Sequence, residues 1–208
     1  MSGEAAAPGH ADALRQGLAR YFTKDEVARL RAARVGIAGA GGLGSNVALM
    51  LARSGVEDML IIDDDVVDAS NLNRQQYWPR HVGRPKVEAL AELLRELNPR
   101  IRLELMNARL DEATLPPLLP VCPIWVEAFD APEAKTLLVE RALLSGRRIA
   151  SASGVAGVGG PAMQRRKLGN LVLVGDFQSD VAFAPPLAPR VTQAAALLAD
   201  AVLEFILR

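Results

Sequence analysis

Acidic, amide and cationic residues follow one another closely between Asp63 and Lys86. Three consecutive acids, "DDD", begin this stretch; Asn71, Asn73 and Arg74 follow, and Lys86 closes it within "GRPK". A site that cleaves a triphosphate needs cations along the phosphates, often together with a magnesium ion that carboxylates hold. We therefore interpret Arg74 and Lys86 as candidate catalytic cations and the two asparagines as amide groups for phosphate or ribose.

A further candidate acid, Asp130, ends the apolar segment "CPIWVEAFD", which predicts a strand. In a doubly wound sheet, residues at the carboxyl ends of the strands project into a common crevice. Two cations, amides and this distant carboxylate at one edge suit phosphoryl or nucleotidyl transfer on an ATP–magnesium complex. Each residue also has a plainer interpretation: Arg74 and Lys86 as solvated surface charges, and Asp130 as the N-cap of the helix that starts in "APEAK".

Gly39, Gly41 and Gly44 form a GxGxxG turn between a predicted strand at 35–38 and a predicted helix. The next predicted strand ends at Asp63, where an acid that binds ribose hydroxyls belongs. Backbone N–H groups and the helix N-terminus then face an anion. This context predicts a nucleotide site, although such a turn can also serve only to pack a helix against a strand.

Segments that predict strands alternate with segments of helical periodicity. Predicted strands cover 35–38, 58–63, 101–108, 122–130 and 147–154, and predicted helices lie within 11–33, from the glycine turn to Arg53, and at 85–98, 132–146 and 191–207. Two further strands, in "MQRRK" and "LVLVGD", are joined by a tight turn. The pattern predicts an α/β fold: a Rossmann-like, doubly wound, mostly parallel sheet with antiparallel strands toward the C-terminus.

Composition argues against several classes of function. The chain has 208 residues, 24 basic and 24 acidic residues, one cysteine and two histidines. The balanced charge disfavours nucleic acid and membrane partners, and the lone cysteine leaves no pair for a disulfide or a structural zinc site. We expect residues 1–10 to be a disordered tail, residues 11–208 to form a single domain, and the protein to be cytoplasmic, because the sequence contains no signal-peptide or membrane-span pattern.

Four motifs carry a family resemblance: "GAGGLGSNVALMLARSGV", "IIDDDVVDASNLNRQQY", "GRPKVEAL" and "FDAPEAK". They resemble those of the ubiquitin-activating-enzyme-like adenylyltransferases, the ThiF/MoeB/HesA superfamily, and most strongly the short ThiF-like proteins of thiamine biosynthesis. The resemblance implies that the C-terminal carboxylate of a ThiS-like sulfur carrier protein ending in Gly-Gly attacks the α-phosphate of ATP. The products are an acyl-adenylate and pyrophosphate. The resemblance also implies magnesium and a homodimer.

The resemblance assigns roles to individual residues of the motifs. Lys86 stabilises charge at the reacting phosphate, and Asp130 binds magnesium. Asp65 lies near the ribose or supports its loop, whereas Asp64 falls at a variable position and is expected to be structural or solvated. The expected nucleotide-binding residues are Gly39, Gly41, Gly42, Gly44, Asp63, Asp65, Ser70, Asn71, Arg74 and Lys86.

The sequence departs from the family pattern in its arginine and cysteine residues. Many members insert an N-terminal arginine into the partner subunit's site, and here Arg20 is a weak candidate and Arg15 a weaker one. Two CxxC zinc pairs are missing. Cys122 precedes a predicted strand, where a small core residue is more typical than a nucleophile. We therefore expect adenylation without covalent capture of the carrier by this chain.

Three other functions stay open on the sequence alone. A tRNA-modifying dehydratase of the same superfamily would require salt-dependent tRNA binding. A nicotinamide-dependent dehydrogenase would bind NADH but not ATP, and would leave Asn71, Arg74 and Lys86 without a role. An inactive scaffold would bind no ATP.

Overall fold

The computed structural model describes residues 12–208, so the predicted tail at 1–10 lies outside the described residues. A seven-stranded sheet has the order β3-β2-β1-β4-β5-β7-β6. Neighbouring strands are parallel from β3 to β7, and β6 is antiparallel to β7, which confirms the predicted fold class. The strands are β1 (Arg34–Ala38), β2 (Asp58–Ile62), β3 (Arg102–Met106), β4 (Ile124–Glu127), β5 (Arg148–Ala152), β6 (Gln164–Leu168) and β7 (Leu171–Gly175).

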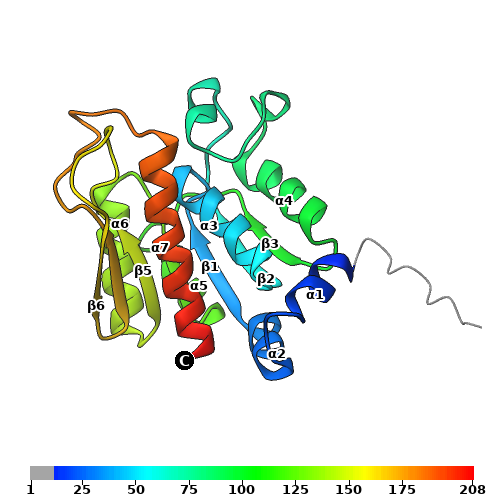
Figure 1. Ribbon diagram of the computed structural model, residues 1–208. Coiled ribbons are helices and arrows are strands. Elements are labelled where there is room, and N and C mark those ends of the chain that lie inside the picture. Colours follow the sequence, from blue (N-terminus) through cyan, green and yellow to red (C-terminus); the bar gives the residue numbers. More distant parts are fainter. Residues whose placement is uncertain (1–11) are drawn as a thin grey trace, which may run out of the picture.

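Helices cover both faces of the sheet (Figure 1). One face carries α2, α3, α4 and α7, and the opposite face carries α5 and α6. Since β2 has a side-chain period of two, Met59 and Ile61 pack into the first layer and Leu60 and Ile62 into the second. The helices are α1 (Ala13–Leu18), α2 (Lys24–Ala32), α3 (Gly42–Arg53), α4 (Lys86–Leu97), α5 (Leu115–Leu118), α6 (Pro132–Leu144) and α7 (Ala188–Leu207).

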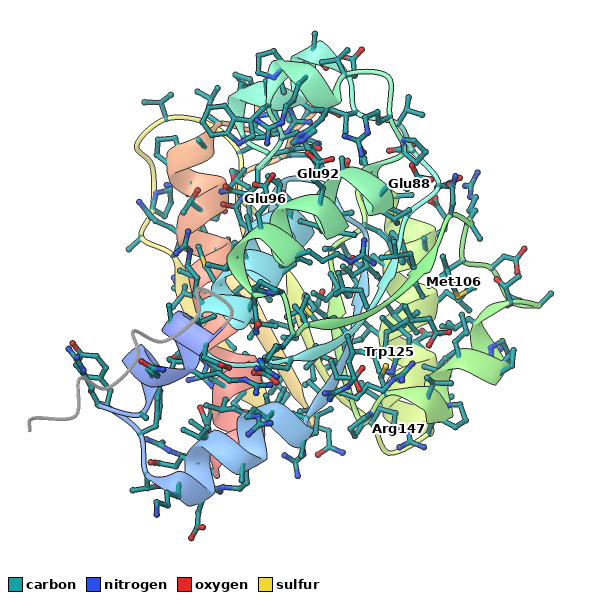
Figure 2. All side chains as sticks on the ribbon, turned by 90° about the vertical axis from the view of Figure 1, so that its right-hand side faces the viewer. Glu88, Glu92, Glu96, Met106, Trp125 and Arg147 are labelled. Carbon is teal, nitrogen blue, oxygen red and sulfur yellow. The ribbon has the colours of Figure 1, made fainter. Side chains whose placement is uncertain are left out.

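Trp125 of β4 is the bulkiest fully buried side chain of the described residues, and it occupies the layer beneath α5 and α6 (Figure 2). A Cβ atom added at Gly36 of β1 would come within 2.6 Å of the Trp125 ring. Any larger residue at Gly36 would therefore displace the Trp125 ring from its packed position.

Several elements have other boundaries than predicted; β2, for example, ends at Ile62, so Asp63 lies directly after the strand. β4 ends at Glu127, so Asp130 lies in the loop beyond the strand and not at its end. Pro132 restricts the residue before it to an extended conformation, which separates this loop from α6. α7 begins at Ala188, before the predicted start at Val191, because Pro189 is tolerated in a first helical turn. α5 and the 3₁₀ turns at 69–73, 79–81 and 119–121 were not predicted.

Within residues 12–208, every helix is too short or too polar to cross a bilayer.

Candidate nucleotide site

The glycine turn brings β1, β2 and β4 together at the carboxyl end of the sheet. Gly39 has φ +101°, its N–H donates to the Ile62 carbonyl at 2.8 Å, and an added Cβ would lie 2.5 Å from the Ala128 carbonyl oxygen. A Cβ at Gly44 would lie 1.8 Å from the Gly39 oxygen. Gly41 is the N-cap of α3 and offers no capping side chain, so the first N–H groups of this helix can face an anion.

Asp63 fastens the glycine turn to the loop after β2. Its Oδ2 accepts from the Ala40 N–H at 2.6 Å and its Oδ1 from the Asp65 N–H at 2.8 Å. Burial raises the pKa of Asp63, and the hydrogen bond from Ala40 and the charge of Lys86 only partly oppose this. Each carboxylate oxygen can accept a further donor, so Asp63 can hold the turn and also accept from a hydroxyl group.

Arg74 packs directly on the N-terminus of α3. A Cβ atom added at Gly42 would lie 3.5 and 3.7 Å from two aliphatic carbons of the Arg74 side chain. Its Nη1 donates to the Ser70 carbonyl at 3.1 Å and to the Asn73 side-chain oxygen at 2.9 Å. The guanidinium is therefore oriented by its own loop and has donors left for a ligand.

Ser70 and Asn71 contribute mainly to the shape of this loop. The Ser70 N–H donates to Asp68 at 2.8 Å, and the Asn71 side-chain oxygen accepts from the Asp68 N–H at 3.1 Å. Together these bonds form a reciprocal cap at the start of the 69–73 turn.

Two polar residues of α3 hold the same loop, and the sequence analysis gave them no role. Asn46 is buried, and its side-chain nitrogen donates to the Gly42 carbonyl at 2.6 Å and to the Arg74 carbonyl at 3.1 Å. The hydroxyl of Ser45 accepts from the Gln76 N–H at 3.2 Å. The sequence contained a signal for this role: Asn46 stands in an otherwise apolar helix, and a buried amide needs hydrogen-bond partners.

Lys86 is buried at the start of α4 and is paired with Asp65. Its Nζ lies 2.6 Å from Asp65 Oδ2, with side-chain exposures of 7% and 66%. Tyr77 joins this corner to the glycine turn, because its hydroxyl donates to the Ala40 carbonyl at 2.7 Å and lies 3.3 Å from the Lys86 carbonyl. Lys86 and Asp65 thus lie beside Asp63, whose Oδ1 accepts from the Asp65 N–H.

Glu92 of α4 fixes the loop that leads into Lys86 (Figure 2). The carboxylate accepts from Arg84 at 2.6 Å and lies 3.2 Å from Nε2 of the buried His81. The Arg84 guanidinium and then His81 lower the pKa of Glu92 to about 2.

A cavity of about 540 Å³ opens at the carboxyl ends of β1, β4 and β5. Three of the predicted site residues line it: Gly42, Arg74 and Asp130. The other predicted residues do not line it: Gly39, Gly41, Gly44, Asp63, Asp65, Ser70, Asn71 and Lys86. The exposed carboxylate of Asp130 offers oxygen ligands of the kind that magnesium prefers. The carboxylates of Asp63, Asp64 and Asp65 also lie within 4.8 Å of one another.

Lys135 of α6 also lines this cavity, and the sequence analysis assigned it no role. Its Nζ donates to Glu127 Oε2 at 2.5 Å and to the Ala152 carbonyl at 3.1 Å. Glu127 is fully buried at the end of β4 and also accepts from the Ser151 hydroxyl at 2.5 Å and from the Phe129 N–H at 2.7 Å. Sequence periodicity could not reveal this network, because it depends on β4 and β5 being neighbours.

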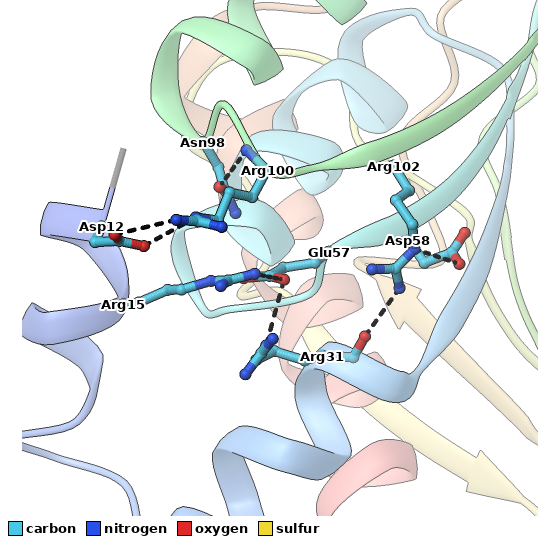
Figure 3. A network of polar contacts seen from close by, with 8 residues as sticks. All are labelled: Asp12, Arg15, Arg31, Glu57, Asp58, Asn98, Arg100 and Arg102. Atoms are coloured by element: carbon cyan, nitrogen blue, oxygen red, sulfur yellow. Dashed lines mark hydrogen bonds and ion pairs between the residues drawn. The ribbon is translucent and has the colours of Figure 1, made fainter. Parts of the chain in front are cut away.

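The remaining candidates lie away from the cavity. Arg15 is paired at 2.5 Å with the buried Glu57, just before β2 at the amino end of the sheet (Figure 3). Arg20 is exposed. Cys122 is buried in the layer beneath α5 and α6, and burial raises its thiol pKa to about 11, which fits the expected core residue.

Comparisons with known proteins place the chain in a family and show similar folds. The sequence profile of the ThiF family matches residues 14–206. The adenylyltransferase and sulfurtransferase uba4 of Emericella nidulans is 37% identical over 142 residues, which cover 68% of this chain and 30% of that protein. The SAMP-activating enzyme E1 of Haloferax volcanii is 38% identical over 117 residues, 53% of this chain and 43% of that protein. The ATP complex of the E. coli tRNA N6-threonylcarbamoyladenosine dehydratase TcdA superposes with a TM-score of 0.84 at 22% identity, covering 96% of this chain and 97% of that one.

Proposed function

Because the chain belongs to the ThiF family, we propose that it is an ATP-dependent adenylyltransferase acting on the C-terminal glycine carboxylate of a ThiS-like, ubiquitin-fold sulfur carrier protein. The chain spans less than half the length of the two relatives, whose names refer to adenylyl and sulfur transfer and to the activation of SAMP. Thiamine or related sulfur metabolism, a cytoplasmic location and a homodimer are parts of the same proposal, and they rest on the sequence motifs.

One observation carries the proposal: Gly42, Arg74 and Asp130 meet at a single cavity although they come from three distant segments. A carboxylate that approaches a polyanion is repelled unless positive groups offset both charges. The N-terminus of α3 and the guanidinium of Arg74 supply positive potential on the β1 side of the cavity. Asp130 supplies an oxygen ligand on the β4 side.

The proposed roles follow from these contacts. Asp63 accepts from a ribose hydroxyl, and the α3 N-terminus and Arg74 bind the phosphates. Lys86 keeps its pair with Asp65 and offers its remaining N–H donors to the reacting phosphate. Magnesium, held by Asp130 and the phosphates, would neutralise charge on the leaving pyrophosphate.

Pyrophosphate release tests this function. Purified protein, ATP, magnesium and a ubiquitin-fold carrier ending in Gly-Gly should release pyrophosphate, and the same carrier lacking its last glycine should not support release. ATP consumption at the same rate with and without the carrier would contradict the proposal. Saturable NADH binding without ATP binding would also contradict it.

A tRNA-modifying dehydratase is the second candidate, because the likeness to TcdA in fold extends over nearly the whole of both chains. Such an enzyme would activate a small carboxylate on tRNA. The balanced charge of 24 basic and 24 acidic residues favours the carrier instead. Tight, salt-dependent tRNA binding would reverse this preference.

A further inference from the structure

The ammonium group of Lys135 lies on the β4–β5 side of the cavity, apart from the groups assigned to the nucleotide. Its side chain is 28% exposed and lines the cavity, whereas the carboxylate of its partner Glu127 is completely buried. Arg74 lies on the other side, against the helix that follows β1.

The ammonium group of Lys135 has one N–H that no acceptor among residues 12–208 takes. A lysine has three N–H donors, and Glu127 Oε2 and the Ala152 carbonyl accept two of them. Both acceptors lie at the ends of β4 and β5 and fix the direction of the ammonium group. The third N–H is therefore available to a ligand in the cavity.

The charge of this pair suits a singly charged ligand better than a triphosphate. Glu127 cancels the charge of Lys135, so the pair supplies a directed hydrogen bond with little net positive potential. A triphosphate carries several negative charges and needs net positive charge, which the Arg74 guanidinium and the N-terminus of α3 provide. A carboxylate gains from one charge-assisted hydrogen bond in a fixed direction.

We propose that Lys135 binds the carboxylate of the acyl substrate, which makes it a further catalytic residue; this rests on the proposed function. Its free N–H donates to one carboxylate oxygen while the other oxygen forms a bond to the α-phosphorus of ATP. The bond from that phosphorus to the bridging oxygen breaks, and pyrophosphate leaves with the electron pair. No proton is transferred, because the carboxylate is already ionised.

The test compares a short peptide ending in Gly-Gly with the same peptide as its C-terminal amide. Both are titrated, by NMR, into protein saturated with a non-hydrolysable ATP analogue. The wild type should bind the acid about tenfold more tightly than the amide, and Lys135→Met should remove most of this preference. Lys135→Arg should retain it in large part, and all three proteins should bind the ATP analogue equally well.

Ser151→Ala is the matched control, because Ser151 donates to the same Glu127 oxygen but does not line the cavity. It should keep the preference for the acid. The proposal is overturned if the wild type shows no such preference, if Lys135→Met retains it, if Ser151→Ala loses it equally, or if Lys135→Met binds the ATP analogue more weakly. A wild type that prefers the acid but releases no pyrophosphate with a carrier contradicts the proposed function alone.

Discussion

Both ends of the parallel sheet carry a buried acid paired with a cation, yet only one end is open. At the amino end, Glu57 is paired with Arg15 and Arg31, and α1 closes the cluster so that a space of only about 10 Å³ remains (Figure 3). At the carboxyl end, Glu127 is paired with Lys135 beside a cavity of about 540 Å³. A buried ion pair therefore does not distinguish the candidate site from the closed end. The open crevice at the carboxyl ends of the strands does distinguish it.

Substitution of Arg74 should give the largest functional effect. Arg74→Ala removes a positioned cation from the carboxyl-end cavity, and we expect kcat to fall by about 10²- to 10³-fold, or about 3–4 kcal/mol of transition-state stabilisation. Within residues 12–208 the hydrogen bonds of this side chain are to its own loop, so the melting temperature should change little. Steady-state pyrophosphate release and thermal unfolding measure the two quantities. A fully active Arg74→Ala would contradict the proposal that the carboxyl-end cavity binds the phosphates.

Substitution of Arg15 should lower the stability of the fold and leave catalysis unchanged. Burial alone would raise the pKa of Glu57, but Arg15 keeps it below its ordinary value. Among the described residues, Arg15→Ala leaves the buried carboxylate paired with Arg31 alone, at 3.4 Å, and should lower the free energy of unfolding by about 3 kcal/mol. Urea unfolding checks this value. Pyrophosphate release per folded molecule should stay at the wild-type level, and a loss of kcat would mean that Arg15 acts in catalysis.

Asp176 provides a smaller and pH-dependent test at the carboxyl end. Burial opposes its ionisation, but the N–H groups of Ser179 and Gln178 and the guanidinium of Arg190 outweigh burial and lower its pKa to about 2. A depressed carboxyl pKa stabilises the fold above the unfolded value, near 4, and this stabilisation is lost as the pH falls through about 2.

Asp176→Asn should therefore lower the free energy of unfolding by about 2 kcal/mol at pH 6. The gap between variant and wild type should narrow steadily as the pH approaches 2. Urea titrations at several pH values measure it. A gap that does not depend on pH would show that the ionised carboxylate contributes nothing to stability.

Sequence reasoning found the parts of the site that local spacing encodes. The glycine turn, Asp63 directly after β2 and Lys86 at the start of α4 follow from strand and helix periods. In the structure Asp63 bonds to the glycine turn and to Asp65, and Asp65 bonds to Lys86. Asp130 was expected at the end of β4, but Glu127 occupies that position and Asp130 lies in the following loop.

The contacts that sequence reasoning missed join residues of different elements that are far apart in the sequence. Lys135 reaches the Ala152 carbonyl only because β5 lies beside β4. Asn46 holds the Arg74 loop across a gap of 28 residues. Such pairings depend on how the sheet is assembled, and a single sequence does not encode them in its local periodicity.

A crystal structure of the protein with magnesium and a non-hydrolysable ATP analogue tests the central claim most directly. The account predicts triphosphate density in the carboxyl-end cavity, over the α3 N-terminus at Gly42 and within hydrogen-bond distance of Arg74, with a ribose hydroxyl on Asp63. Nucleotide bound elsewhere, or phosphates directed away from Arg74, would contradict it.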